Sequence, residues 1–390
     1  MTTQDILFRL LRAELMQEPL TETERGALKK ELGEEQRKKL FVLSKTHDVS
    51  AMVACALLES EIIERGETWY NEFRREVPRA IFRYENQCYE IARIKELFES
   101  EGIEFLFLKG VVLRDYYAKP YQRTCCDVDV LIKKDKLKKV EKLLVDRLGY
   151  SLQKEKGYHD VTLIAPSKVV VELHFSVCED NPKADKVLLK AWEHVQKVTQ
   201  QSCEYRFTNE FAYFYHVAHA AYHFLSGGCG IKPFMDAYRL MSELSINQEE
   251  LSRLLVESDL EKFAKVMAEL SQAWLENLPK GKTLQLTEKY VLMGGCYGLK
   301  TNEIYIKSVK KGSGFKYVLG RIFASYDNLR TKYPIIEKHK WLTPFCHVDR
   351  WFSALFGKRR KKSLEEFSVM RSITDGQREE FAYLIKELGL

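Results

Sequence analysis

The sequence predicts an α+β protein in which a small mixed sheet is flanked by helical regions on its N-terminal and C-terminal sides. Two observations predict this class. Apolar residues recur at helical spacing through residues 1–101 and again from 184 onward, whereas patterns typical of strands cluster between 103 and 178. We therefore expect four parts: an N-terminal helical region (1–101), an α/β core (102–178), a helical domain (179–300) and a basic helical C-terminal region (301–390).

The N-terminal region contains several helical patterns. Four leucines at helical spacing indicate a first helix (residues 7, 10, 11 and 15). A second pattern covers 34–47, and a third follows Asp48, which we interpret as its N-cap. The segment 67–101 is helical in composition, and Pro78 predicts a bend or a restart within it.

The core is expected to alternate strands and helices. Short apolar or alternating runs predict strands at 104–108, 127–132, 159–164 and 169–177, and helical patterns lie at 111–117 and 135–148, with Gly149 as a stop. The residues Ala165-Pro-Ser-Lys168 favour a turn, so the last two strands should form an antiparallel hairpin. Beyond the core, helical patterns cover 184–195, 208–226, 233–245, 248–257, 260–278 and, less clearly, 285–330.

Composition excludes several classes of protein. With 45% hydrophobic residues, the chain can bury a core, which argues against wholesale disorder. No run approaches 18 apolar residues and the N-terminus lacks signal-peptide features, so we expect a cytoplasmic protein without a transmembrane segment. The nine cysteines are scattered and include no Cys-x-x-Cys, which suits neither a disulfide framework nor a zinc site.

Charge is unevenly distributed along the chain. Residues 300–362 hold 16 Lys and Arg against four acids, a net of +12, while the whole chain carries only +6. Aromatic residues are interleaved with these basic ones, a pattern that can bind single-stranded nucleic acid or a membrane surface. We favour the simpler interpretation, an exposed helical segment whose lysines are solvated.

Carboxylates are placed on one face of two predicted strands. Alternation along 127–132 puts Asp127 and Asp129 on the same face, about 7 Å apart, where they would repel one another unless a cation lay between them. Glu172 and His174 share a face of the later strand, so Glu172 joins the pair if the strands are neighbours. Three such carboxylates could hold two Mg²⁺ ions, and one could act as a general base. The alternative is an amphipathic strand with a solvated face.

A glycine turn precedes these acids. The apolar strand 104–108 ends in Lys109-Gly110 before a helical pattern, and such a junction attracts phosphate groups. Arg123 could clamp a phosphate, or it could pair with Asp127 or Asp115.

Histidines recur in and beyond the core. His174 could orient an acid or meet the acceptor, although a half-buried, hydrogen-bonded histidine is the safer interpretation. His216, His219 and His223 share one face of the predicted helix 208–226, where aromatic neighbours favour packing over zinc binding. Asp236 is expected to cap a helix.

Together these residues resemble a known family. The segments Leu108-Lys-Gly-Val-Val-Leu-Arg114, Asp127-Val-Asp-Val-Leu-Ile132 and Val171-Glu-Leu-His174 are similar to the nucleotidyltransferase superfamily of the polymerase-beta type, and in particular to its bacterial branch of uncharacterised nucleotidyltransferases. Further similarity to this branch lies at His219, His223-Phe224, Gly228-x-Gly230 and Pro233-x-x-Asp236, and in the tail at Tyr333-Pro334, Trp341-x-x-Pro344 and Arg350.

The resemblance implies a role for each matching residue. Asp127, Asp129 and Glu172 would be the catalytic metal ligands, and Lys109 and Gly110 would hold the triphosphate. Arg123 and His174 are further candidates for nucleotide contact. The sequence departs from the superfamily in its Gly110-Val111 turn, where Gly-Ser or Gly-Gly is usual, and in having Glu as the third acid.

The resemblance also implies an activity. It indicates an Mg²⁺-dependent enzyme that moves a nucleoside monophosphate from a nucleoside triphosphate to a hydroxyl and releases pyrophosphate, with two ions at the site. The acceptor could be a small molecule, a protein or an RNA. Two alternatives stay open: a non-catalytic, nucleotide-binding regulatory protein on the same fold, and a nucleic-acid-binding protein that uses the basic C-terminal segment.

Overall fold

Helices form the N-terminal region, as expected. The computed structural model describes residues 1–156, 159–179, 181–296, 298–299, 301–304, 306, 326, 329, 333, 335–355 and 374–390. The first five helices are α1 (Thr3–Leu15), α2 (Glu22–Glu31), α3 (Glu34–Thr46), α4 (Ser50–Glu59) and α5 (Tyr70–Ser100). Capping boxes start α1 at Thr2 and α2 at Thr21, which satisfies backbone N–H groups that the helix itself leaves unpaired.

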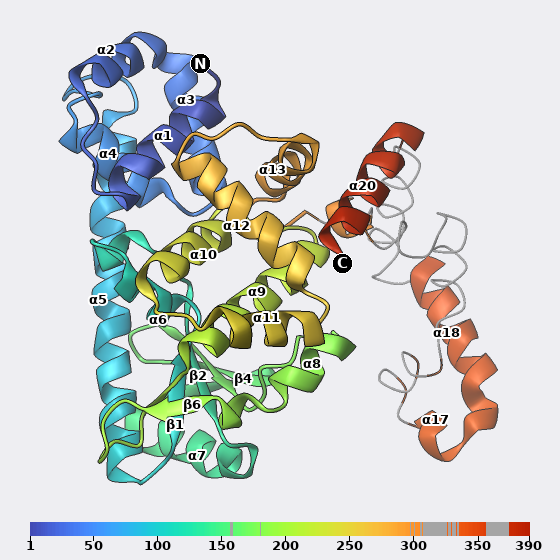
Figure 1. Cartoon of the computed structure of the whole chain (residues 1–390). Helices are drawn as coiled ribbons and strands as arrows, with labels where there is room; N and C mark the ends of the chain where they lie inside the picture. The colour runs from blue at the N-terminus through green and yellow to red at the C-terminus, as the bar shows by residue number, and fades with distance from the viewer. Residues whose placement is uncertain are drawn as a thin grey trace.

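Two details of this region differ from expectation. Val49, not Asp48, is the N-cap of α4; Asp48 has a φ of 52°, and its carboxylate accepts hydrogen bonds from Thr124 and Lys232. The predicted cap was wrong because these distant donors occupy the side chain. Helix α5 also runs without a restart through Pro78, as one continuous rod in Figure 1.

The core is a five-stranded mixed sheet. Its strands are β1 (Phe105–Leu108), β2 (Asp127–Ile132), β3 (Ser151–Lys156), β4 (Asp160–Ile164) and β5 (Val170–His174), in the order β1-β2-β5-β4-β3. β2 and β5 are parallel, and the other neighbours are antiparallel. The expected β4–β5 hairpin is confirmed. β3 was not predicted, because its sequence, Ser-Leu-Gln-Lys-Glu-Lys, lacks an apolar alternation.

Short helices connect these strands. α6 (Gly110–Leu113) is a single turn continued by a 3₁₀ helix (Arg114–Tyr116), and a second 3₁₀ helix (Pro120–Gln122) precedes β2. After β2 come a 3₁₀ helix (Lys134–Lys136) and α7 (Leu137–Leu148), which ends at Gly149 with a φ of 72°, as the sequence predicts.

The two faces of the sheet have different neighbours. Val128 and Val130 of β2 pack in a core with Phe98 of α5 and Leu144 of α7. On the opposite face, Leu131 belongs to a second core. Because side chains alternate along a strand, the acids of β2 lie on the face that carries Leu131.

The remaining described elements are mainly helical. They are α8 (Pro182–Leu188), a 3₁₀ helix (Ala191–Glu193), β6 (Val195–Lys197), β7 (Tyr205–Phe207), α9 (Asn209–Leu225), α10 (Lys232–Glu243), α11 (Gln248–Glu257), α12 (Glu261–Leu275), α13 (Lys282–Gly294), α17 (Ile335–Lys338), a 3₁₀ helix (Lys340–Leu342), α18 (Thr343–Leu355) and α20 (Asp375–Leu388). The predicted helix 184–195 ends early, and the β6–β7 hairpin was missed.

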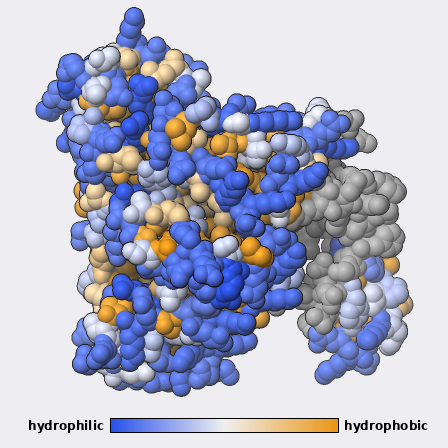
Figure 2. Space-filling model, in the orientation of Figure 1, coloured by the Kyte–Doolittle hydropathy of each residue, from blue (hydrophilic) through white to orange (hydrophobic). Residues whose placement is uncertain are grey.

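The second core draws on both helical regions. It unites Leu7 and Leu10 of α1 with Phe214 of α9, Phe234 of α10 and Met267 of α12. Figure 1 shows these helices side by side above the sheet, and the face seen in Figure 2 is mostly hydrophilic with small apolar groups. None of the described helices combines the length and apolar content needed to cross a membrane.

Much of the basic segment 300–362 lies outside the described residues, as does most of the predicted helix 285–330 beyond α13. The described parts of that segment include α17 and α18. The interpretation of this segment as an exposed helical region with solvated lysines stays a prediction, as does the alternative that it binds nucleic acid or a membrane surface.

A buried histidine predicts acid sensitivity. His47 is fully buried after α3, and burial lowers its pKa to about 4. The unfolded chain binds a proton at this residue below about pH 6.5, whereas the folded protein does not until about pH 4, so stability falls as the pH falls through this window. We expect urea unfolding to show His47 contributing about 2 kcal/mol to the loss between pH 7 and pH 5.

The matched variants are His47→Gln and His339→Gln, the second at an exposed position. His47→Gln should flatten the dependence of unfolding free energy on pH, and His339→Gln should leave it unchanged. An equally steep profile in His47→Gln would contradict the assignment.

Candidate active site

The parallel pairing of β2 and β5 brings two acids together. In the register of these strands Asp129 lies opposite Glu172, and Asp127 lies opposite Val170. Asp127, Asp129 and Glu172 therefore share one sheet face, as alternation predicts for neighbouring strands. This face is the one turned toward the helical half of the molecule, because Leu131 joins the core that contains α9.

Asp129 is the most connected of these carboxylates. Its side chain is 2% exposed, and Oδ1 accepts hydrogen bonds from Lys109 Nζ at 2.9 Å and from His174 Nε2 at 2.8 Å. Burial by itself raises the pKa of Asp129, but the positive charge of Lys109 and the contact with His174 outweigh it and hold the pKa well below its usual range. Asp129 is thus an ionised, buried acceptor.

His174 joins the two strands' acids. Its Nε2 lies 2.8 Å from Asp129 Oδ1 and 3.4 Å from Glu172 Oε2, and its side chain is 2% exposed. Burial lowers the pKa of His174, but the hydrogen bonds to both carboxylates raise it more, so the net shift is upward. The residue is more deeply buried than the half-buried histidine expected from sequence.

Among the described residues, one group near the sheet has ligand atoms all within 4.8 Å of one another: Asp129, Glu172 and His174. Asp127 is not a member of this group, although it lies close enough for its charge to interact with both acids. Burial, and next the charges of Asp129 and Glu172, raise the pKa of Asp127 to about 6. The three carboxylates therefore repel one another, and a bound cation would reduce this repulsion.

Lys109 supplies the local positive charge. It follows β1 with a φ of 53°, and this turn directs its ammonium to Asp129. Burial lowers the pKa of Lys109, but the carboxylate of Asp129 more than offsets this and raises it well above its usual value. Lys109 is therefore a permanent cation at the site.

Gly110 is required for packing. A Cβ placed on it would lie 2.4 Å from Cys125 Cβ, far inside van der Waals contact. Gly110→Ala should lower the free energy of unfolding by about 1–3 kcal/mol, since overpacking displaces the turn that carries Lys109. Urea unfolding measures the loss of stability, and the rate of pyrophosphate release measures the effect of displacing Lys109.

Two second-site changes sharpen this test. Cys125→Gly removes the clashing Cβ and should restore part of the loss, whereas Cys125→Ala keeps that atom and should not. As a control, Gly26→Ala in α2 meets nothing within 4 Å and should be neutral or slightly stabilising. A wild-type unfolding curve for Gly110→Ala would rule out this packing account.

Arg123 occupies a buried ion pair. Its Nε and Nη2 donate to the two carboxylate oxygens of Asp236 at 2.8 and 2.7 Å, and Tyr117 donates its hydroxyl to the same group at 2.7 Å. The alternative that Arg123 pairs with Asp127 or Asp115 was wrong, because its carboxylate partner is Asp236 of α10. The contact of Arg123 with a phosphate stays a prediction, and the expected capping role of Asp236 was wrong because α10 has no side-chain cap.

Sequence reasoning did not single out Glu179. This buried acid follows β5, and its Oε1 lies 2.6 Å from His219 Nδ1 on α9. His219 and His223 were recognised as sharing a face but were assigned to packing. The usable signal was an acid five residues after His174, in the segment that follows the strand with Glu172, together with the i, i+4 spacing of the two histidines.

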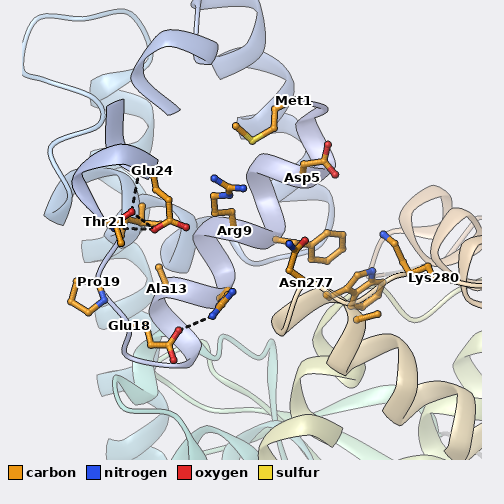
Figure 3. A pocket seen from close by; sticks show the side chains of 15 residues that line it. Met1, Asp5, Arg9, Ala13, Glu18, Pro19, Thr21, Glu24, Asn277 and Lys280 are labelled. Carbon is orange, nitrogen blue, oxygen red and sulfur yellow. Dashed lines mark hydrogen bonds and ion pairs between the residues drawn. The ribbon is translucent and has the colours of Figure 1, made fainter. Parts of the chain in front are cut away.

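A cavity lies away from the acidic face of the sheet, beside the N-terminal helices. It has a volume of about 610 Å³ and is bordered by α1, the loop before α2 and the end of α12, with Arg9, Trp274 and Lys280 among its lining residues. Figure 3 shows Arg9 on the N-terminal side of this cavity and Lys280 on the opposite side. None of the residues of the acidic face lines this cavity.

Comparison with known proteins identifies the family of this chain. The resemblance predicts Asp-x-Asp on one strand and a third acid on a later strand, and the structure sets Asp129 opposite Glu172 on parallel neighbours. Residues 33–276 match the family described as "Uncharacterised nucleotidyltransferase", and the chain belongs to this family. It is accordingly an enzyme of the nucleotidyltransferase type. No curated protein matches the chain.

Proposed function

We propose that the enzyme transfers a nucleoside monophosphate from a nucleoside triphosphate to a hydroxyl group of an acceptor and releases pyrophosphate, with Mg²⁺ as cofactor. The observation that carries this proposal is the register of β2 and β5, which sets Asp129 against Glu172 beside the ammonium of Lys109.

The residues present fit divalent magnesium. Mg²⁺ prefers oxygen ligands, and Asp127, Asp129 and Glu172 offer three carboxylates on one face. The raised pKa of Asp127 reflects burial and the two neighbouring negative charges, so a cation here would lower the repulsion. Imidazole suits softer metals better, and we therefore assign His174 to holding Asp129 in place.

Mg²⁺ held by these carboxylates, as one ion or two, would polarise the triphosphate and offset the charge that develops on the leaving pyrophosphate. The protein's own groups act around it. Lys109 reaches the site from the turn after β1, where its ammonium can interact with a triphosphate oxygen as well as with Asp129. The backbone of Gly110 lies next to it. His174 keeps the Asp129 carboxylate in one orientation.

A second candidate function is nucleotide binding without turnover. Its specific support is that Lys109 and His174 both already contact Asp129 Oδ1, together with the absence of a hydroxyl in the Gly110-Val111 turn. A regulatory protein of this kind would bind nucleotide and release no pyrophosphate.

The deciding experiment offers the four α-³²P-labelled ribonucleoside triphosphates with Mg²⁺ and, as acceptor mixtures, the macromolecular fraction and the small-molecule fraction of a cell extract. We expect one triphosphate to release pyrophosphate and to transfer label to a component of the extract, and excess EDTA to abolish both. Calorimetric binding of that triphosphate with no transfer under any of these conditions would favour the regulatory alternative.

A further inference from the structure

Three side chains form a hydrogen-bonded chain from the end of β5 into α9. Glu179 Oε1 lies 2.6 Å from His219 Nδ1, and His219 Nε2 lies 3.1 Å from His223 Nε2. The two rings meet edge to face at 4.4 Å. Both nitrogens of His219 are therefore used, one toward a carboxylate and the other toward a second imidazole.

These contacts determine where the protons lie. A carboxylate only accepts, so His219 donates from Nδ1 to Glu179, and its Nε2 is left as an acceptor. His223 must then donate from Nε2, which leaves Nδ1 of His223 without a proton. With Glu179 ionised, the free basic atom of the chain is Nδ1 of His223.

Burial determines which member can keep an added proton. Glu179 is 6% exposed, and burial raises its pKa, whereas burial lowers the pKa of His219 and of His223. The positive charge of Lys109 adds to this effect for both histidines. An imidazolium is thus disfavoured on α9, and a proton that enters the chain is best accommodated on Glu179.

The chain lies beside the acidic face. Charges on Lys109 and Asp129 act on both His219 and His223, and Lys109 also interacts with Glu179. His223 is only partly buried, in contrast to Glu179 at the inner end. The accessible end of the chain is therefore an imidazole, and the closed end is a carboxylate.

We propose that His223, His219 and Glu179 form a proton relay that accepts the proton of the acceptor hydroxyl during nucleotidyl transfer. The proposed relay rests on the proposed function. It places the general base on α9, whereas the sequence suggested that one of the three carboxylates, Asp127, Asp129 or Glu172, could act as that base. His223 is the catalytic residue of the relay because it meets the acceptor; His219 and Glu179 act through it.

Nucleotidyl transfer replaces one bond at the α-phosphorus with another. The acceptor oxygen forms a bond to the α-phosphorus, and the bond from the α-phosphorus to the oxygen that bridges to the β-phosphate breaks, with its electron pair leaving on pyrophosphate. The hydroxyl proton moves to Nδ1 of His223, the Nε2 proton of His223 moves to Nε2 of His219, and the Nδ1 proton of His219 moves to Glu179. Glu179 becomes neutral and later returns the proton through His219 and His223, the accessible end of the chain, to water.

The test uses the full-length enzyme in the labelled-triphosphate assay. His223→Ala should lower kcat about 10²- to 10³-fold with little change in the KM for the triphosphate. Added imidazole should restore at least tenfold of that loss, since it can enter the space left by the ring. The control is His216→Ala on the same helix, since the ring of His216 contacts the Pro233 carbonyl and lies outside the relay. Added imidazole should not raise the kcat of this variant.

Glu179→Gln keeps an oxygen that accepts from His219 Nδ1 but cannot take the proton, so it should lower kcat while the thermal unfolding temperature stays close to that of the wild type. A wild-type kcat in Glu179→Gln, or a folded His223→Ala without imidazole rescue, would overturn the relay. Absence of transfer by the wild-type enzyme would instead contradict the proposed function itself.

Discussion

Asp129→Asn should lower the rate of pyrophosphate release by about 10³-fold, which corresponds to roughly 4 kcal/mol of transition-state stabilisation. The carboxylate of Asp129 is 2% exposed and is the acceptor shared by Lys109 and His174. Asparagine has nearly the same shape and keeps one oxygen for those donors, but it removes the negative charge that a metal ion needs. Steady-state assays of pyrophosphate formation measure the effect.

The matched control is Asp135→Asn. Asp135 lies three residues beyond the end of β2 but is exposed, so its loss should leave the rate unchanged. Thermal unfolding of both variants separates loss of chemistry from loss of structure. If folded Asp129→Asn released pyrophosphate at the wild-type rate, the acidic face of β2 and β5 would not be the site of reaction.

Asp236→Ala should lower the free energy of unfolding by about 3–5 kcal/mol, because it leaves the buried guanidinium of Arg123 without its counter-charge. Side-chain exposure in this pair is 10% for Arg123 and 0% for Asp236. Burial raises the pKa of Asp236, but the charge of Arg123 outweighs it and keeps the carboxyl ionised. Urea unfolding monitored by circular dichroism gives the free-energy difference.

Replacing Arg123, Asp236 and Tyr117 together by apolar residues should lower the free energy of unfolding much less than Asp236→Ala does. In Arg123→Met/Asp236→Leu/Tyr117→Phe no buried charge or hydroxyl is left alone, so most of the stability should return. Breaking the exposed pair Lys142–Asp146, whose side chains are 78% and 53% exposed, should cost less than about 0.5 kcal/mol. A cost for Asp236→Ala no larger than this surface value would contradict the assignment.

The strands that sequence predicted are those with a clear local pattern. β1, β2, β4 and β5 carry apolar runs or alternation, and all four were expected. β3 is a polar strand at the edge of the sheet, and β6 and β7 have three residues each, too few for a period to be recognised. β3 forms by pairing with β4, and β6 by pairing with β7, rather than from a pattern within each strand.

The sequence by itself determined that Asp127 and Asp129 share one face of their strand and that Glu172 and His174 share one face of theirs. Side-chain direction alternates along a strand, so it is a local property. Only the tertiary structure decided that these faces are one face, through the parallel register of β2 and β5. The same holds for Arg123 with Asp236, 113 residues apart, and for Glu179 with His219, 40 residues apart. Such pairs form because burying a charge is unfavourable without a partner, and which partner is within reach depends on how the whole chain packs.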